Sequence, residues 1–266
     1  MFIDAEHIAA YENSLTLRGR SSRTAAKYST TVSAFLRESG QVDETRLGTA
    51  WAEWINAARR TMAAGTIRLR LTVGKSFCDF MQAAQGPLSD YKRPPLPEPV
   101  PHPLPGGVAD VRLMADKAAT EQAMFAVILG GLAGLRVSET ISITRDDVLS
   151  TGELRVKGKG EKERRIPISS ELARYVDKMP AEGRLVPMSN AGARKAITVA
   201  AERAGIAGPE GEGVSSHDLR ATFGTAVYDK TKDIVLVQRL LGHSDVKTTQ
   251  VYIGANAQST REAVEF

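Results

Sequence analysis

The chain has almost no cysteine and no long apolar run. These two shortages exclude several classes of protein. Cys78 is the only cysteine among 266 residues, which excludes an internal disulfide and a cysteine-rich zinc or iron–sulfur site. No run approaches the roughly 18 apolar residues of a membrane span. The first twenty residues carry Asp4, Glu6 and Glu12 instead of an apolar secretory signal. We therefore expect a protein of the reducing cytoplasm that has no membrane partner.

Motifs for nucleotide and metal chemistry are also missing. The chain has no Gly-x-x-x-x-Gly-Lys-Ser/Thr loop, and Gly158–Gly160 is too short to cradle a nucleotide. It has no His-x-x-x-His pair and no carboxylates spaced like a metal site. If this chain breaks phosphodiester bonds, we expect it to do so without a metal ion, ATP or another cofactor.

Positive charge is slightly in excess and is unevenly distributed. The chain has 35 Lys and Arg against 31 Asp and Glu, a net charge of +4. Residues 1–93 hold 13 basic and 9 acidic side chains, whereas residues 106–266 hold 22 and 21. The excess in the first third is a weak indication of a polyanionic partner. A solvated surface of mixed charge explains it equally well.

A proline-rich segment divides the chain. Seven of the twelve residues of Pro94–Pro105 are proline, a density that no helix or central strand tolerates. Polyproline II geometry makes such a segment a semi-rigid strap. We therefore predict a first domain over residues 1–93, a linker over 94–105 and a second domain over 106–266.

The first domain has a helical pattern throughout. Ser21 or Ser22 can cap a helix that carries Tyr28, Val32, Phe35 and Leu36. Residues 51–60 and 67–81 form two further helical stretches, and no strand pattern interrupts them. Basic residues on the later stretches predict a DNA-binding edge made of Arg59, Arg60, Arg68, Arg70 and Lys75.

The second domain is mainly α with a small antiparallel sheet. Helical patterns include residues 124–129 and begin again near Arg136 and Ser170. Residues 153–168 favour two short strands joined by the turn at Gly158–Gly160. Asp233 is a suitable N-cap for a last helix, which Gly242 would end.

A set of cations and one tyrosine in this domain could together transfer a phosphoryl group. Two arginines can bind the non-bridging oxygens of one phosphate. A free tyrosine has a pKa of about 10, so a tyrosine nucleophile needs a neighbouring base such as histidine. A lysine ammonium can protonate the leaving alkoxide. Each residue alone has an ordinary structural explanation, so the prediction depends on their order and joint spacing. The residues are Arg136, Lys159, His217, Arg220, His243 and Tyr252, with Glu139 one helical turn after Arg136.

Four motifs in this order resemble tyrosine recombinases of the phage integrase and Xer type. They are GLRVSE at 134–139, VKGKGEKERRIPI at 156–168, HDLRATF at 217–223 and LLGHSDVKTTQVY at 240–252. The last motif is very specific, and the helical first domain is similar to the family only in layout. The resemblance implies an all-helical core-binding domain followed by an α-rich catalytic domain with a small antiparallel sheet.

The resemblance also implies a role for each residue. Arg136 and Arg220 would bind the scissile phosphate, with His243 as a second ligand. His217 would be the general base, and Lys159 would protonate the leaving 5′ oxygen. Tyr252 would be the nucleophile and form a 3′-phosphotyrosyl bond, while Glu139 would support the site. The implied partners are double-stranded DNA at specific sites, three further copies of the chain in a synapse, and a directionality factor.

The departures from the family pattern favour a simple enzyme. Ala221 stands where many relatives carry His or Arg, but this position does not belong to the catalytic residues. We also expect no arm-binding domain before residue 1. A phage or mobile-element integrase is therefore the first hypothesis. The alternatives are an Xer-type resolvase of chromosome or plasmid dimers, a catalytically idle DNA-binding protein, and a relaxing enzyme similar to type IB topoisomerases.

Overall fold

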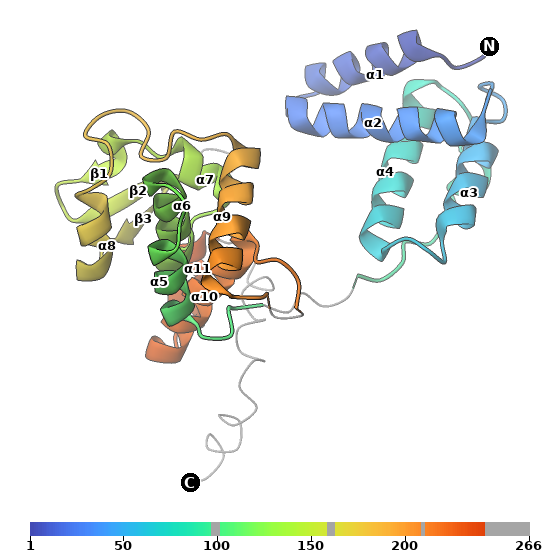
Figure 1. Cartoon of the computed structure of the whole chain (residues 1–266). Coiled ribbons are helices and arrows are strands. Elements are labelled where there is room, and N and C mark those ends of the chain that lie inside the picture. Colours follow the sequence, from blue (N-terminus) through green and yellow to red (C-terminus); the bar gives the residue numbers. More distant parts are fainter. Residues whose placement is uncertain (97–101, 159–162, 209–210, 243–266) are drawn as a thin grey trace. The chain divides into compact units, whose positions relative to one another are not determined.

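The chain forms two compact units, Met1–Glu98 and Pro99–Phe266. The computed structural model describes residues 1–96, 102–158, 163–208 and 211–242 (Figure 1). None of the described helices is long and apolar enough to cross a membrane. Each unit has its own hydrophobic core, so each is described by itself.

Four helices build the first unit: α1 (Ala5–Leu17), α2 (Ser22–Ser39), α3 (Leu47–Ala58) and α4 (Ala64–Phe80), with the short 3-10 turn η1 (Gly86–Leu88) after them. The Ser21 hydroxyl caps α2 by accepting from the Thr24 amide, which confirms the predicted start of this helix. Helix α1 was not predicted from the sequence. It begins at Asp4, whose carboxylate accepts from the Glu6 and His7 amides.

Aromatic side chains fill the first core. The Phe35 and Trp51 rings lie 4.2 Å apart between centroids, and Trp51 also meets Trp54 edge-on at 5.5 Å. The Trp51 indole packs so closely on α4 that a Cβ at Gly74 would collide with it. Its Nε1 donates to the Arg70 carbonyl at 2.9 Å. These contacts fix α3 against α4 at one distance, because the interior has no room for a larger side chain.

The predicted basic edge is wrong at Arg70. Its side chain is 7% exposed, lies 3.9 Å from the Glu38 carboxylate, and stacks 3.4 Å above the Trp54 ring centroid. The apolar face of α4 points inward at this position, and the guanidinium remains charged there because a carboxylate and an aromatic face surround it. Arg59 and Arg60 are exposed, and Arg68 and Lys75 are partly exposed.

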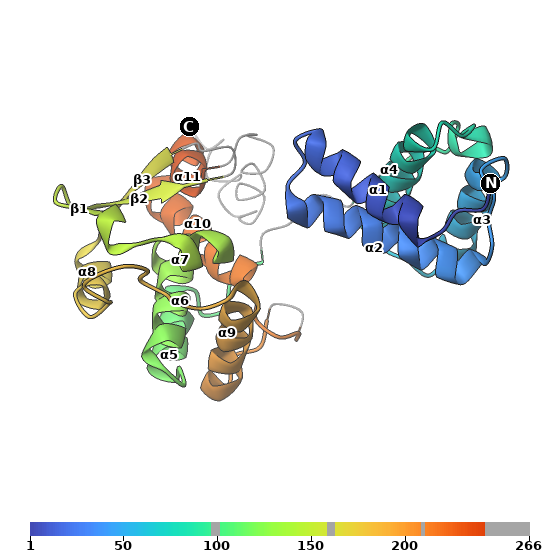
Figure 2. The ribbon, with the colours of Figure 1, turned by 90° about the horizontal axis from the view of Figure 1, so that it is seen from above.

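The second unit is built around helix α6 (Glu121–Leu132), which is apolar on nearly all sides. It runs among α5 (Val108–Asp116), α9 (Asn190–Ala204) and α10 (Ser216–Thr231), as Figure 2 shows. The described part of this unit also contains the shorter helices α7 (Val137–Ser142), α8 (Ser170–Val176) and α11 (Ile234–Leu241). Leu104, at the end of the predicted linker, is buried in this core, and its amide donates to the Thr222 hydroxyl at 2.8 Å.

A three-stranded antiparallel sheet in the order β1-β2-β3 covers one side of this unit. Strands β2 (Glu153–Lys157) and β3 (Glu163–Pro167) form the predicted hairpin, and β1 (Val148–Leu149), which follows the turn η2 (Arg145–Asp147), was not predicted. Their register pairs Val156 with Arg164 and Leu154 with Ile166. Since side chains alternate along a strand, these four residues share the inward face. Helix α11 lies beside β3 (Figure 2).

Candidate active site

Glu139 is the centre of a cluster of three arginines. It lies in the first turn of α7, and its side chain is only 5% exposed. Its carboxylate accepts hydrogen bonds from the Arg136 amide at 2.8 Å and from Arg136 Nη1 at 2.9 Å. It also accepts from Arg164 Nη1 at 2.9 Å and Nη2 at 2.8 Å, and Arg220 Nη1 lies 3.7 Å away. One carboxylate therefore holds three cations, which leaves the cluster with a net positive charge.

Arg136 is the most exposed of the three arginines. It is the residue before α7 and has extended backbone angles, so its amide can turn back to the Glu139 carboxylate. Its side chain is 37% exposed, whereas the Arg164 and Arg220 side chains are almost completely buried. Arg136 is thus the cation of this cluster that a ligand can reach most directly.

Arg220 joins two turns that are far apart in the sequence. It lies in the second turn of α10 and donates to the Gly134 carbonyl at 2.6 Å and to the Leu241 carbonyl. Gly134 has a positive φ of 64°, and a Cβ there would collide with the Phe223 ring. Glycine is required at this position because the turn before Arg136 must pass close to α10.

Sequence reasoning missed Arg164. It lies on the inward face of β3 and donates to both Glu139 oxygens, and its Nε donates to the Leu240 carbonyl at 2.8 Å. Strand alternation could have revealed it, since Arg164 shares a face with Ile166 whereas Arg165 points outward. A charged residue on the buried face of a strand needs a partner of opposite charge.

The three arginines also hold the end of α11. The carbonyls of Leu240 and Leu241 accept from Arg164 and Arg220, and the Gly242 carbonyl lies 3.5 Å from Arg136 Nη2 in a weak contact. The last carbonyls of a helix lack partners within the helix and carry its negative dipole end, so cations stabilise them. Gly242 ends α11 with φ 64°, as predicted. The cluster therefore fixes the point at which the chain leaves toward residue 243.

Arginine neighbours keep Glu139 ionised. Burial by itself would raise the pKa of this carboxyl. The hydrogen bonds and charge of Arg164 and Arg136 outweigh the burial and hold the pKa below its ordinary value of 4.5.

The remaining predicted residues fall into two groups. His217 is exposed in the first turn of α10, three residues before Arg220, and its amide donates to the capping Ser215 hydroxyl at 3.1 Å. Lys159, His243 and Tyr252 lie outside the described residues. The described chain stops next to two of them, at Gly158 in the hairpin and at Gly242 after α11. The structure thus brings Arg136, Glu139 and Arg220 together and adds Arg164.

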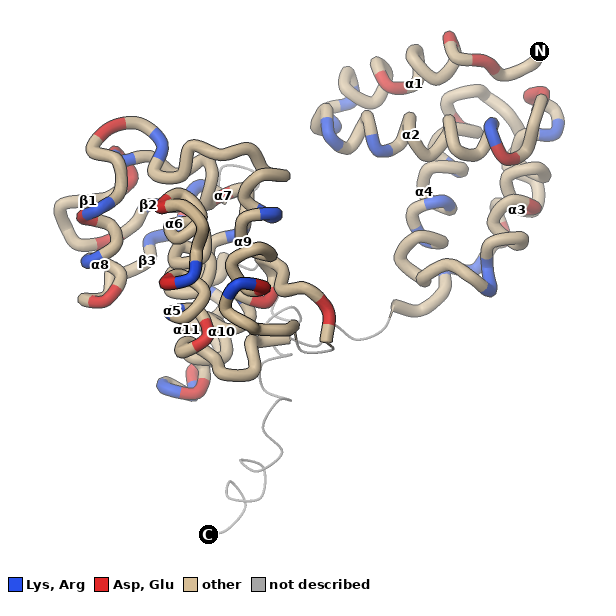
Figure 3. Tube along the Cα trace, in the orientation of Figure 1, with Lys and Arg blue, Asp and Glu red and all other residues tan. Residues whose placement is uncertain are grey.

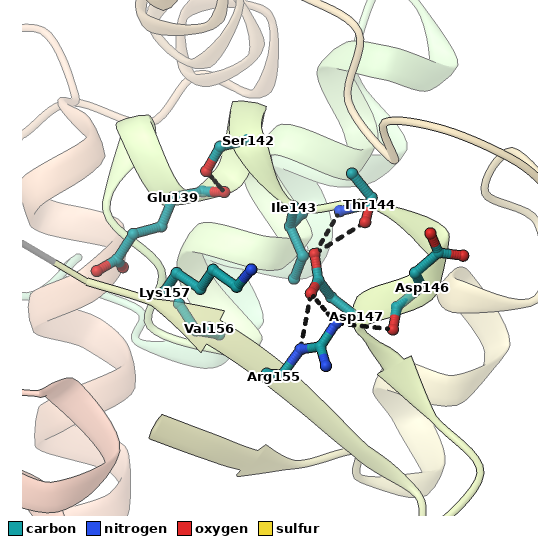
Figure 4. A pocket seen from close by; sticks show the side chains of 9 residues that line it. All are labelled: Glu139, Ser142, Ile143, Thr144, Asp146, Asp147, Arg155, Val156 and Lys157. Carbon is teal, nitrogen blue, oxygen red and sulfur yellow. Dashed lines mark hydrogen bonds and ion pairs between the residues drawn. The ribbon is translucent and has the colours of Figure 1, made fainter. Parts of the chain in front are cut away.

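A pocket of about 360 Å³ is lined on one side by Glu139. Figure 4 shows the Lys157 side chain between Glu139 and Asp147, with Arg155 bound to Asp147. Asp147 also accepts from the Thr144 amide at 3.0 Å and hydroxyl at 2.9 Å, which ties β2 to the turn after α7. These bonds support the strand that leads to residue 158.

We expect the substitution Glu139→Gln to destabilise the second unit in a pH-dependent manner. A carboxylate with a lowered pKa stabilises the fold at pH values above 4.5, and this contribution is lost as the pH falls through the lower pKa of the folded state. Near neutral pH, removing one partner of buried ion pairs costs about 3–5 kcal/mol. Urea unfolding of wild type and variant between about pH 7 and pH 3 should show this gap shrinking below pH 4.5.

The exposed Glu182 provides the matched control for this experiment. Glu182→Gln changes the same group without an arginine partner, so its unfolding free energy should follow wild type at every pH. A constant gap for Glu139→Gln across the whole range would contradict the ionised cluster.

Replacing Arg164 should show how much the cluster depends on its geometry. Arg164→Lys keeps the charge, but one ammonium cannot span two carboxylate oxygens and the Leu240 carbonyl as a guanidinium does. We expect a loss of roughly 2–4 kcal/mol in unfolding free energy, measured by urea titration. The neighbouring Arg165 side chain is 63% exposed, and Arg165→Lys should cost almost nothing. Equal losses in the two variants would exclude a special role for Arg164.

Comparisons with known proteins identify the relatives of this chain. Residues 111–259 match the phage integrase family. Tyrosine recombinase XerC of Vibrio atlanticus (strain LGP32) is 31% identical, over 96% of this chain and 90% of the relative. XerC of Bradyrhizobium diazoefficiens is 30% identical over 75% of this chain and 70% of its own length.

Solved structures share the fold. A lambda integrase dimer bound to a COC′ core site superposes with a TM-score of 0.78 at 16% identity, covering 97% of each chain. XerH recombinase bound to difH DNA gives a TM-score of 0.66 at 18% identity, over 96% of this chain and 83% of that one. With the matched family region and the XerC identity, the arginine cluster around Glu139 leads to one conclusion: the chain belongs to the phage integrase family of tyrosine recombinases.

Proposed function

We propose that this chain is a site-specific recombinase that cleaves and rejoins DNA through a covalent 3′-phosphotyrosyl intermediate. The observation that carries the proposal is the buried Glu139 carboxylate, which aligns Arg136 and Arg220 beside the end of α11. Such a fixed group of cations favours a phosphorane-like transition state, because its positive charge is in place before negative charge develops on the phosphate oxygens.

In the proposed reaction Arg136 and Arg220 bind the non-bridging oxygens of the scissile phosphate, with His243 as a further ligand. His217 takes the proton from the Tyr252 hydroxyl as its oxygen attacks phosphorus. The bond to the 5′ oxygen breaks, and Lys159 gives this oxygen a proton. The bond energy is kept in the tyrosyl phosphodiester, so attack by a 5′-hydroxyl from another strand rejoins DNA and releases Tyr252.

In this proposal the site residues divide into positioning residues and residues that act directly on the DNA. Glu139 and Arg164 touch no reacting atom and act as positioning residues for Arg136, Arg220 and the end of α11. In the sequence, Lys159 falls between β2 and β3, and His243 and Tyr252 follow the last residue of α11. Assembly on DNA would bring these groups to one phosphate.

The first unit would serve as the core-type DNA-binding domain and the second as the catalytic domain, acting on DNA in the cytoplasm. Arg59, Arg60, Arg68 and Lys75 remain candidates for phosphate contacts in the first unit. A lambda integrase tetramer is known bound to a Holliday junction, and we propose the same number of copies here, with a directionality factor as an additional partner. Since phosphate contacts release counterions, binding should weaken steeply with salt.

A second candidate is resolution of chromosome or plasmid dimers. The XerC relative covers nearly the whole chain at 31% identity. This match favours the resolvase role, whereas the simple layout of the sequence favoured a phage or mobile-element integrase. Sequencing the DNA beside the gene separates the two roles, because an integrase lies next to an attachment site.

Covalent trapping tests the proposed function. A nicked suicide substrate carrying the candidate site loses a short fragment after cleavage and so prevents rejoining. The full-length protein should form a protein–DNA adduct that survives denaturation and disappears after protease treatment. A chain that binds the substrate without forming this adduct would be the catalytically idle alternative.

A further inference from the structure

A pocket in the first unit has the chemistry of an anion site. It measures about 260 Å³ and lies between the α1–α2 turn, α2 and α4. Arg18 and Arg20 line it from the turn, and Tyr28, Thr72 and Ser76 line it from the helices. No carboxylate is among its lining residues.

The two arginines have no acidic partner within the described part of the chain. Both are exposed, and from residue 13 to residue 37 the sequence contains no Asp or Glu. Arg23 and Lys27 continue the positive charge along α2. Figure 3 shows this gathering of Lys and Arg at the α1–α2 turn and the start of α2.

Backbone hydrogen bonds close the turn that carries the arginines. Gly19 has φ 77°, and the Arg20 amide donates to the Leu15 carbonyl at 3.0 Å, closing the end of α1. The next residue, Ser21, already caps α2. Arg18 and Arg20 are therefore held on a backbone with little freedom, which lowers the entropy lost on binding a ligand.

Two hydroxyl groups of the pocket, those of Ser76 and Tyr28, can donate to a ligand, whereas the Thr72 hydroxyl donates to the Arg68 carbonyl at 2.9 Å. Burial raises the pKa of Tyr11 to about 12, so its hydroxyl stays protonated and donates to Ser76 Oγ at 2.9 Å. Ser76 then has its own proton to give to a ligand. The Tyr28 hydroxyl has no hydrogen-bond partner among the described residues and can donate as well.

The predicted basic edge on α3 and α4 contrasts with this pocket. Lys75 donates to the Ser89 carbonyl at 2.9 Å, Arg68 to the Pro94 carbonyl at 3.1 Å, and Arg59 lies 5.6 Å from the Tyr91 ring centroid. Those cations already have partners within the first unit. The Arg18 and Arg20 guanidiniums have none there, so binding an external anion costs them no internal contact.

We propose that this pocket binds a backbone phosphate of duplex DNA, an inference that rests on the proposed function. Arg18 and Arg20 supply charge-assisted hydrogen bonds to the non-bridging oxygens, and the Tyr28 and Ser76 hydroxyls supply neutral ones. Such a contact carries no sequence information and fixes the register of the first unit on the duplex. Free inorganic phosphate offers the same oxygen chemistry, so the test separates the two sources.

The test compares two double variants of the full chain. R18Q/R20Q removes both pocket charges. R37Q/R46Q removes two charges from exposed side chains of the same unit outside the pocket, 74% and 66% exposed. Equilibrium binding of a fluorescent random-sequence duplex is measured across a salt series. Thermal unfolding of each variant confirms that it is folded.

R18Q/R20Q should bind the duplex roughly tenfold more weakly and lower the slope of log Kd against log salt by about 1 per phosphate contact. R37Q/R46Q should stay within about threefold of wild type. Tyr28→Phe removes a neutral donor, so it should weaken binding roughly threefold without changing the slope. If the two double variants lost the same affinity, or if Tyr28→Phe bound the duplex as tightly as wild type, the pocket would not be the phosphate site.

Inorganic phosphate is the second arm. If phosphate, compared with chloride at equal ionic strength, stabilises wild type but not R18Q/R20Q while both bind DNA equally, the pocket takes free phosphate and the DNA assignment is overturned. Failure of the proposed function has a different signature, because it appears as the absence of a covalent adduct in wild type. The duplex measurement needs no cleavage.

Discussion

Tyr252→Phe should abolish the covalent adduct and recombination while specific DNA binding stays within about twofold of wild type. The substitution removes one hydroxyl and keeps the ring, so it removes the nucleophile with little change in packing. Loss of an essential nucleophile costs roughly 10⁴-fold or more in rate. The adduct is measured on a suicide substrate under denaturing conditions, and binding is measured by gel shift on the same DNA.

The matched control is Tyr228→Phe, which removes a hydroxyl from a tyrosine of α10 in the same domain. It should form the adduct at a rate close to that of wild type. Persistence of nicked or covalent product in Tyr252→Phe would show that another residue attacks the phosphate. The proposed reaction would then lose its nucleophile even if the chain still binds DNA.

Lys159→Ala should lower the rate of adduct formation on ordinary DNA by roughly 10²–10⁴-fold. In the proposed reaction the lysine gives a proton to the departing 5′ oxygen. A 5′-bridging sulfur leaves as a thiolate and needs no proton. The same variant should therefore cleave a 5′-bridging phosphorothioate at a rate within about tenfold of wild type, and the measurement is a comparison of the two single-turnover rates.

Lys157 is the control for this experiment. It lies at the end of β2, two residues before Lys159, and is exposed. Lys157→Ala removes an ammonium from the same hairpin and should show no selective rescue by sulfur. An equal defect of Lys159→Ala on both substrates would assign this lysine to DNA positioning and not to proton transfer.

Local chemistry was sufficient to predict several helix ends. The Ser21 and Asp233 side chains accept from amides in the first turns of α2 and α11, as their spacing indicated. Gly242 ends α11 in the left-handed region for an equally local reason. Such signals need only neighbouring residues, so a single sequence contains them. The two-residue strand β1 was missed because two residues carry no periodicity.

The burial and pairing of charged side chains could not be predicted from neighbouring residues in this way. Arg70 and Arg164 are both arginines in amphipathic elements. Strand alternation can place Arg164 on the inward face with Ile166, but no residue nearby in the sequence identifies the partner of either arginine. Arg70 is buried because Trp54 and Glu38 from other helices lie next to it. Arg164 is buried because Glu139, 25 residues earlier, turns toward β3. Each pairing joins separate elements, so it depends on how those elements pack.

The sequence by itself determined the family motifs, the helical character of both units and the positions of Arg136, Glu139 and Arg220 along the chain. Only the tertiary structure decided that one buried carboxylate aligns three arginines and that these arginines hold the end of α11. It also decided that Arg18 and Arg20, without an acidic partner, line a pocket with Tyr28. The physical reason is the distance along the sequence over which each interaction acts. Caps and periodicity act over a few residues, whereas burial and ion pairing depend on which distant elements pack together.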